Sequence, residues 1–256
     1  MEKIVAAVDD EHAALRAMLS GLSPEDWARP SACAGWSVAD VVLHLAQTDE
    51  LARGSALGDI EAAVLAVGWE PGVLGGDQPL DVDAVADRAV VRGRGADPAE
   101  LLARWSTAAD GLCAALRAVD PRAPLTWVVG RLPARTLATT RLAECWIHAG
   151  DIGHAFGIEP EPTERIWHIA RLAWRTIPYA FIKSGHTLTG PVGLVLKAPD
   201  GSTWRFDPDE PAATVVEGDA HAFCQLAARR LTPAQSGLQA TGPDADAVLE
   251  LARTFA

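Results

Sequence analysis

The sequence lacks any stretch that approaches the roughly 18 uninterrupted apolar residues of a membrane-spanning helix. Its first residues, MEKIVAAVDDEH, also lack the basic start and the apolar run of a secretion signal. Of the 256 residues, 49% are hydrophobic, so the chain can still bury a sizeable core as one large domain or two modest ones. We therefore expect a cytoplasmic protein that does not associate with membranes.

Basic runs are also missing. The chain has 22 Lys and Arg against 34 Asp and Glu, a formal net charge of −12, and its basic residues stand singly or in pairs. Proteins that bind nucleic acid usually carry a basic patch or helix. The charge balance therefore disfavours a DNA-binding regulator and predicts that no nucleic acid is a partner.

Cysteines are few and widely spaced. The four of them, Cys33, Cys113, Cys145 and Cys224, form no CxxC pair, which argues against a zinc knuckle and against a disulfide framework. This usage fits a reducing compartment. Cys145 follows Glu144 directly and lies about 100° round the expected helix from it, so we expect its side chain to be packed.

Apolar residues recur at intervals of three and four along four segments, which predicts four long helices. Ser37 with Asp40 three residues later is a capping-box-like start, and the helix that Ser37 begins is expected to stop near Gly54. Four such helices are typical of an antiparallel bundle, although the Gly- and Pro-rich residues 68–83 predict an unusually long loop. The expected helices cover residues 2–22, 38–54, 98–119 and 134–156.

The pattern changes after Gly157. Residues 162–181 predict another helix, with Thr163 as its N-cap, which bridges two domains. Short β-prone runs and two further helical segments follow. The fold class is therefore α+β, with a helical bundle over residues 1–160, and a bridging helix and small α+β domain resembling sterol-carrier modules over residues 161–256. The β-prone runs are VGLVLKA, STWRFD and ATVVEG.

The segment RLAECWIHAGDIGHAFG carries ionisable residues along one helical stripe. At about 100° per residue, Glu144, His148 and Asp151 fall within roughly 60° of one another. Glu144 and His148 lie about one turn apart, a spacing at which two side chains can bind one metal ion. If helices 38–54 and 134–156 are neighbours, His44 could supply a third ligand across the bundle core.

Each part of this constellation also has a simpler interpretation. A Glu and a His four residues apart, such as Glu144 and His148, can form a surface hydrogen bond, and a single histidine such as His44 is often a core residue. Asp151 fits an exposed acid as well as a site residue. Arg141, close to the same stripe, could hold an anionic group or form a salt bridge to a neighbouring helix. The residues alone leave these alternatives open.

The stretches GWSVADVVLHLAQTDE and RLAECWIHAGDIGHAFG resemble the DinB-like superfamily, and the second resembles its mycothiol-dependent maleylpyruvate isomerase branch. The preceding SACAGWSV resembles the loop before the metal-binding helix of that branch. The similarity covers about residues 1–160 and implies a DinB-like four-helix bundle. It further implies that His44, Glu144 and His148 bind a divalent metal, most simply zinc. Asp151, as an orienting residue or substrate contact, and Arg141 are the candidate catalytic residues.

The resemblance also implies mycothiol as a co-substrate. A metal-bound thiol ionises, and because no cysteine of the sequence is placed to supply it, we expect an external low-molecular-weight thiol. The expected activity is that of a metal- and thiol-dependent transferase or isomerase acting on a small electrophile. Two alternatives stay open: a hydrolase that uses metal-bound hydroxide with Asp151 as general base, and a non-enzymatic ligand-binding module. The sequence does not distinguish a monomer from a homodimer.

Overall fold

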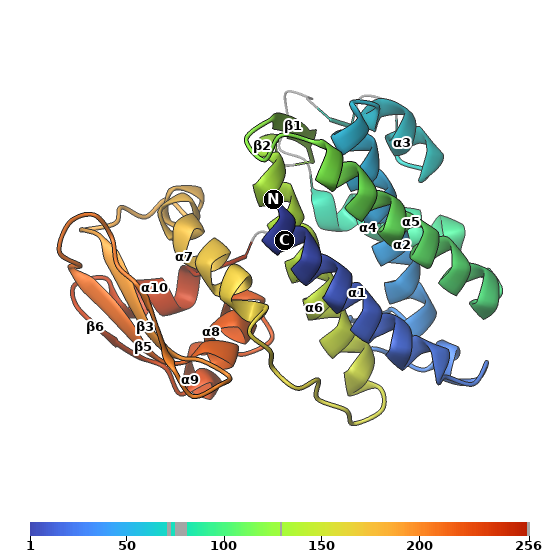
Figure 1. Ribbon diagram of the computed structural model, residues 1–256. Helices are drawn as coiled ribbons and strands as arrows, with labels where there is room; N and C mark the ends of the chain where they lie inside the picture. The colour runs from blue at the N-terminus through green and yellow to red at the C-terminus, as the bar shows by residue number, and fades with distance from the viewer. Residues whose placement is uncertain (71–72, 75–80, 129, 255–256) are drawn as a thin grey trace. The chain divides into compact units, whose positions relative to one another are not determined.

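The computed structural model describes residues 1–70, 73–74, 81–128 and 130–254, and the chain forms two compact units, Met1–Pro160 and Glu161–Ala256 (Figure 1). Of the loop expected over residues 68–83, residues 71–72 and 75–80 lie outside the described residues, and Val82 and Asp83 belong to a helix. The α+β class is confirmed, since the first unit is mainly helical and the second combines helices with a sheet.

Four long helices form the first unit and confirm the expected bundle. Helix α1 packs against α5 and α6, and α2 packs against the same two helices, so all four enclose one core. That core contains Leu15, Leu45, Trp105 and Ile152, each at most 1% exposed. The four helices are α1 (Glu2–Ser20), α2 (Val38–Leu57), α5 (Pro98–Ala118) and α6 (Ala134–His154).

Helix α2 begins as expected but ends later. The Ser37 side chain accepts a hydrogen bond from the Asp40 amide at 3.2 Å, and the Asp40 carboxylate accepts one from the Ser37 amide at 2.9 Å. The end expected near Gly54 comes too early, because α2 continues to Leu57 and stops at Gly58, whose φ is 78°. Gly54 instead permits close packing, since a Cβ there would lie 2.5 Å from the Cβ of Ala63.

Several short elements of the first unit were not expected from the sequence. They are the 3-10 turn η1 (Asp26–Ala28), helices α3 (Ile60–Ala66) and α4 (Val82–Gly93), and an antiparallel hairpin of β1 (Pro124–Trp127) and β2 (Gly130–Pro133). Helices α3 and α4 both pack against α2. They therefore cover α2, the helix that carries His44.

The second unit is built on a four-stranded sheet of order β4-β3-β5-β6. Strands β3 and β5 are parallel, and β4 and β6 each pair antiparallel with their neighbour. Helices α7, α8 and α10 gather on one side of this sheet (Figure 1). The elements are α7 (Ile166–Lys183), β3 (Val192–Lys197), β4 (Thr203–Phe206), β5 (Thr214–Asp219), α8 (Ala220–Ala227), α9 (Pro233–Ser236), β6 (Gln239–Thr241) and α10 (Ala245–Leu251).

Helix α7, which was expected to bridge two domains, belongs to the second unit and packs there against α8 and β3. Its expected N-cap is wrong. Thr163 accepts a backbone hydrogen bond from the Ile166 amide within a separate turn, and Arg165 occupies the N-cap position. The turn that Thr163 begins therefore precedes the helix instead of opening it.

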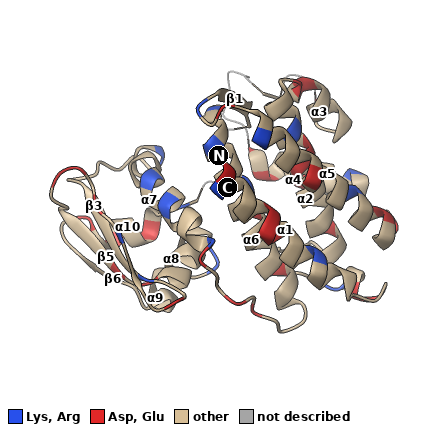
Figure 2. Ribbon diagram, in the orientation of Figure 1, with Lys and Arg blue, Asp and Glu red and all other residues tan. Residues whose placement is uncertain are grey.

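None of the helices in the described part of the chain combines the length and the apolar character that crossing a membrane requires. Lys and Arg, blue in Figure 2, are spread over elements of both units and are interleaved with Asp and Glu.

Two glycines of α6 provide a matched test of how the chain packs over the end of this helix. A Cβ at Gly153 would lie 2.5 Å from the carbonyl oxygen of Ile158, where the chain folds back over the end of α6, whereas a Cβ at Gly150 meets nothing within 4 Å. Gly153→Ala should lower the free energy of unfolding by about 1–3 kcal/mol. Gly150→Ala should raise it by up to about 1 kcal/mol, because alanine favours the helix. Urea unfolding of both variants checks this, and equal midpoints would contradict the described end of α6.

Candidate metal centre

Three side chains predicted as metal ligands meet inside the bundle, because α2 and α6 are neighbours. The Nε2 atom of His44 lies 3.3 Å from Oε2 of Glu144, and Nε2 of His148 lies 3.7 Å from the same oxygen. Glu144 and His148 are buried, each 9% exposed, and His44 is half-buried. The stripe on α6 therefore faces the interior of the bundle and not solvent.

The spacing of these donors fits a divalent cation. Zinc bonds of about 2.0–2.2 Å in a tetrahedron place neighbouring nitrogen and oxygen donors roughly 3.3–3.6 Å apart. The two separations measured from Glu144, 3.3 and 3.7 Å, are close to that edge, and the three candidate ligand atoms all lie within 4.8 Å of one another. Two imidazoles and one carboxylate also form a donor set that zinc accepts, with a fourth position open.

The electrostatics of the site keep His44 and Glu144 in the forms that bind metals. Burial lowers the pKa of His44 below its usual value, so the imidazole is neutral at neutral pH. Burial alone would raise the pKa of Glu144, but the hydrogen bond with His44 and the charge of Arg141 outweigh it and hold that pKa well below its usual range. Glu144 is therefore an anion in the bundle core.

Asp151 lies on the far side of the His148 ring. Its Oδ2 is 2.9 Å from Nδ1 of His148, and the residue is only 2% exposed. A carboxylate accepts a hydrogen bond from Nδ1–H, which leaves the lone pair of Nε2 pointing towards Glu144. This geometry orients the histidine and leaves Asp151 little access to solvent.

Arg141, one turn before Glu144, forms ion pairs with two carboxylates within the bundle. Its Nε lies 3.4 Å from Oδ1 of Asp49 on α2, and its Nη2 lies 3.5 Å from Oε2 of Glu144. The guanidinium also donates a hydrogen bond to Thr48 at 3.2 Å. Because Arg141 is 2% exposed, the salt bridge to the neighbouring helix describes its surroundings better than a free anion-binding group does.

Behind Arg141 lies a buried charge cluster that the sequence did not reveal. His12 of α1 places Nε2 3.7 Å from Oδ2 of Asp49. Burial lowers the pKa of His12 and raises the pKa of Asp49, although each group partly offsets the shift of the other. No motif joins residues so far apart in the chain, so only the helix packing brings them together.

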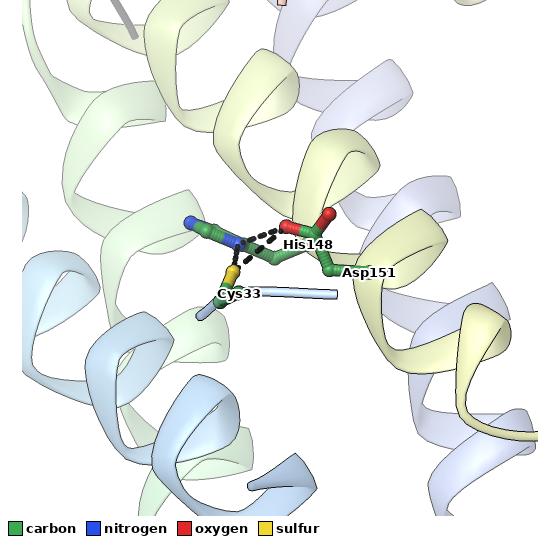
Figure 3. Close-up of side chains that lie close together, drawn as sticks. All are labelled: Cys33, His148 and Asp151. Atoms are coloured by element: carbon green, nitrogen blue, oxygen red, sulfur yellow. Dashed lines mark hydrogen bonds and ion pairs between the residues drawn. The ribbon is translucent and has the colours of Figure 1, made fainter. Parts of the chain in front are cut away.

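Cys33 lies beside the site, which the sequence did not indicate. Its Sγ lies 3.7 Å from Nδ1 of His148 and 3.1 Å from Oδ2 of Asp151 (Figure 3). Cys33 comes from the loop before α2, and its approach to α6 depends on a long-range contact that no local pattern reveals. Cys145, by contrast, is packed in the core as expected, at 1% exposure.

A helical bundle with two histidines and a carboxylate converging in its core is typical of helical metal-binding proteins. Residues 8–153 match the family described as Mycothiol maleylpyruvate isomerase N-terminal domain, which covers more than half of the chain. The chain therefore belongs to this family.

Relatives span both units. Two uncharacterized proteins of Mycobacterium tuberculosis, from strains CDC 1551 and H37Rv, are each 33% identical over 255 residues, covering 98% of this chain and 95% of the relative. The crystal structure of the mycothiol-dependent maleylpyruvate isomerase aligns with a TM-score of 0.59 at 20% identity. A histidine-to-alanine mutant of that enzyme aligns with a TM-score of 0.58 at 21% identity. Both alignments cover 94% of this chain and 92% of the other, and at this identity they establish a shared fold.

The buried cluster predicts how stability depends on pH. The pKa of His12 lies below its ordinary value of 6.5 in the folded protein, so on acidification the unfolded chain binds a proton first. The stability that neutral His12 contributes is therefore complete above its ordinary pKa of 6.5 and is lost as pH falls through the lowered pKa of the folded state. In the metal-free protein, His12→Gln should flatten this part of the profile of unfolding free energy against pH. His154→Gln, which changes an exposed histidine, should leave the profile unchanged. Parallel profiles for wild type and His12→Gln would contradict the assignment.

Proposed function

We propose that the chain is a divalent-metal-dependent enzyme that uses mycothiol to isomerise, or to conjugate, a small electrophilic substrate. The observation that carries the proposal is the convergence of His44, Glu144 and His148 on one point in the bundle core. Membership of the Mycothiol maleylpyruvate isomerase N-terminal domain family supports mycothiol as the thiol and isomerisation as the reaction.

Three protein donors leave one position of a tetrahedral ion open. A zinc ion held there would bind the sulfur of an external thiol and lower its pKa, so that the nucleophilic thiolate is available at neutral pH. Burial alone would favour the protonated, neutral form of Glu144. Because His44 and Arg141 stabilise the carboxylate, Glu144 supplies a negative charge to the site. Asp151 holds the ring of His148 through Nδ1. These residues therefore keep the binding geometry fixed before substrate arrives, which is the form of preorganisation that favours catalysis.

The role of Asp151 argues against the hydrolase alternative. A general base must reach the proton that it removes, directly or through one water. The Oδ2 atom of Asp151 already accepts hydrogen bonds from His148 and Cys33, and the residue is 2% exposed. These contacts suit a residue that orients the ring of His148. They do not suit the general base that the hydrolase alternative assigns to Asp151.

Metal content tests the ligand set. After dialysis, wild-type protein should retain about one zinc per chain, as expected for three protein ligands. His44→Ala and Glu144→Ala should lose it, because each removes one of the three donors. His154→Ala provides the control, since His154 is an exposed histidine at the end of the same helix as Glu144. Zinc loss from the wild type, or ligand variants that hold zinc as tightly as the wild type, would contradict the site.

Turnover tests the dependence on thiol. With maleylpyruvate as the probe substrate, isomerisation by the zinc-loaded protein should require added mycothiol and should fall to background without it. His44→Ala should be inactive even with mycothiol, whereas His154→Ala should match the wild type. Hydrolytic turnover that proceeds without any thiol would support the hydrolase in place of the proposed enzyme.

A further inference from the structure

The loop before α2 holds Cys33 in a defined position. The Ala32 amide donates a hydrogen bond to the backbone carbonyl of Asp151 at 3.1 Å, which ties the loop to α6. The Cys33 amide donates to the Ser31 hydroxyl at 3.1 Å, and the Cys33 carbonyl accepts from the Trp36 amide at 3.0 Å. The sulfur is therefore held against α6 by the backbone on both sides of it.

Three donor atoms of different chemistry meet at this point. The Sγ atom of Cys33 lies 3.7 Å from Nδ1 of His148 and 3.1 Å from Oδ2 of Asp151. The same Nδ1 and Oδ2 atoms lie 2.9 Å apart. Figure 3 shows the sulfur and the carboxylate facing the same ring nitrogen of His148, while the other ring nitrogen points away from them. That other nitrogen, Nε2, is the atom that faces Glu144. The two edges of one imidazole thus face two different sets of donors.

The triangle has nearly the dimensions of a metal site. Zinc bonds of about 2.3 Å to sulfur and about 2.0–2.2 Å to nitrogen and oxygen give tetrahedral edges of roughly 3.3–3.6 Å. The sulfur–nitrogen separation already matches, and the two separations to Asp151 are those of hydrogen bonds, about half an ångström shorter than the tetrahedral edges. Small rotations of the Cys33 and Asp151 side chains would open the triangle to the required size. Thiolate, imidazole and carboxylate together form a donor set suited to borderline and soft cations.

We propose that Cys33, His148 and Asp151 form a second cation site, which takes a divalent ion such as zinc, cobalt or cadmium. When both sites are filled, the His148 ring bridges them, with Nε2 in the first and Nδ1 in the second. Binding at the second site replaces the hydrogen bonds to Asp151 by metal–ligand bonds. It releases the Cys33 thiol proton and the Nδ1 proton to solvent, so the second ion binds more weakly than the first.

Cobalt titration of reduced, metal-free protein tests this site, with a phosphine as reductant so that no added thiol competes. A sulfur-to-cobalt charge-transfer band in the near ultraviolet reports a bond to a cysteine thiolate. Wild-type protein should develop this band during the second equivalent of cobalt. Cys33→Ser should bind the first equivalent and show no band. Cys145→Ala, which removes the packed cysteine of the same helix as His148, should behave as wild type.

His44→Ala separates this proposal from the proposed function. This variant lacks a ligand of the first site but keeps all three donors of the second, so it should bind one equivalent of cobalt and show the band. Asp151→Asn should weaken the band in every background. Circular dichroism confirms that each variant is folded. Binding of a single equivalent without a charge-transfer band, in folded wild-type protein, would overturn the second site and leave Cys33 as a hydrogen-bond donor to Asp151.

Discussion

The buried carboxylate of Glu144 is the constraint on which the bundle depends most. A charge removed from water is costly unless opposite charge and hydrogen bonds surround it. His44 from α2 and Arg141 from α6 provide that compensation, which favours packing α2 beside α6. Without a partner helix, the polar stripe of α6 would destabilise the core it faces.

Polar contacts between buried side chains extend from the site of Glu144 in two directions. On one side, Arg141 contacts Asp49, and Asp49 contacts His12, so ionisable side chains of three helices are linked through the interior. On the other side, His148 contacts Asp151, which also accepts a hydrogen bond from the thiol of Cys33. The loop before α2 is thereby tied to the site. A bundle built in this way holds its donors in place before any ion or substrate binds.

Local signals predicted most of this fold because they act within a few residues. The Ser37 capping box, the apolar periodicity and the Glu144–His148 spacing all depend on contacts inside one helix. The features that the sequence did not predict depend instead on contacts between segments that are distant in the chain. Gly54 reads as a helix end locally, yet its small size is used for packing against α3, and Cys33 reaches α6 only through the folded loop. Non-local contacts of this kind leave no pattern in a single sequence.

The central claim is that one ion binds where the two helices meet, and anomalous diffraction at the zinc absorption edge tests it most directly. Crystals grown with zinc should show an anomalous peak about 2.0–2.2 Å from Nε2 of His44, Nε2 of His148 and a carboxylate oxygen of Glu144. That result would establish the ligand set on which the proposed chemistry rests. Crystals that show no peak between α2 and α6, or an ion held there without His44 and Glu144, would contradict the account.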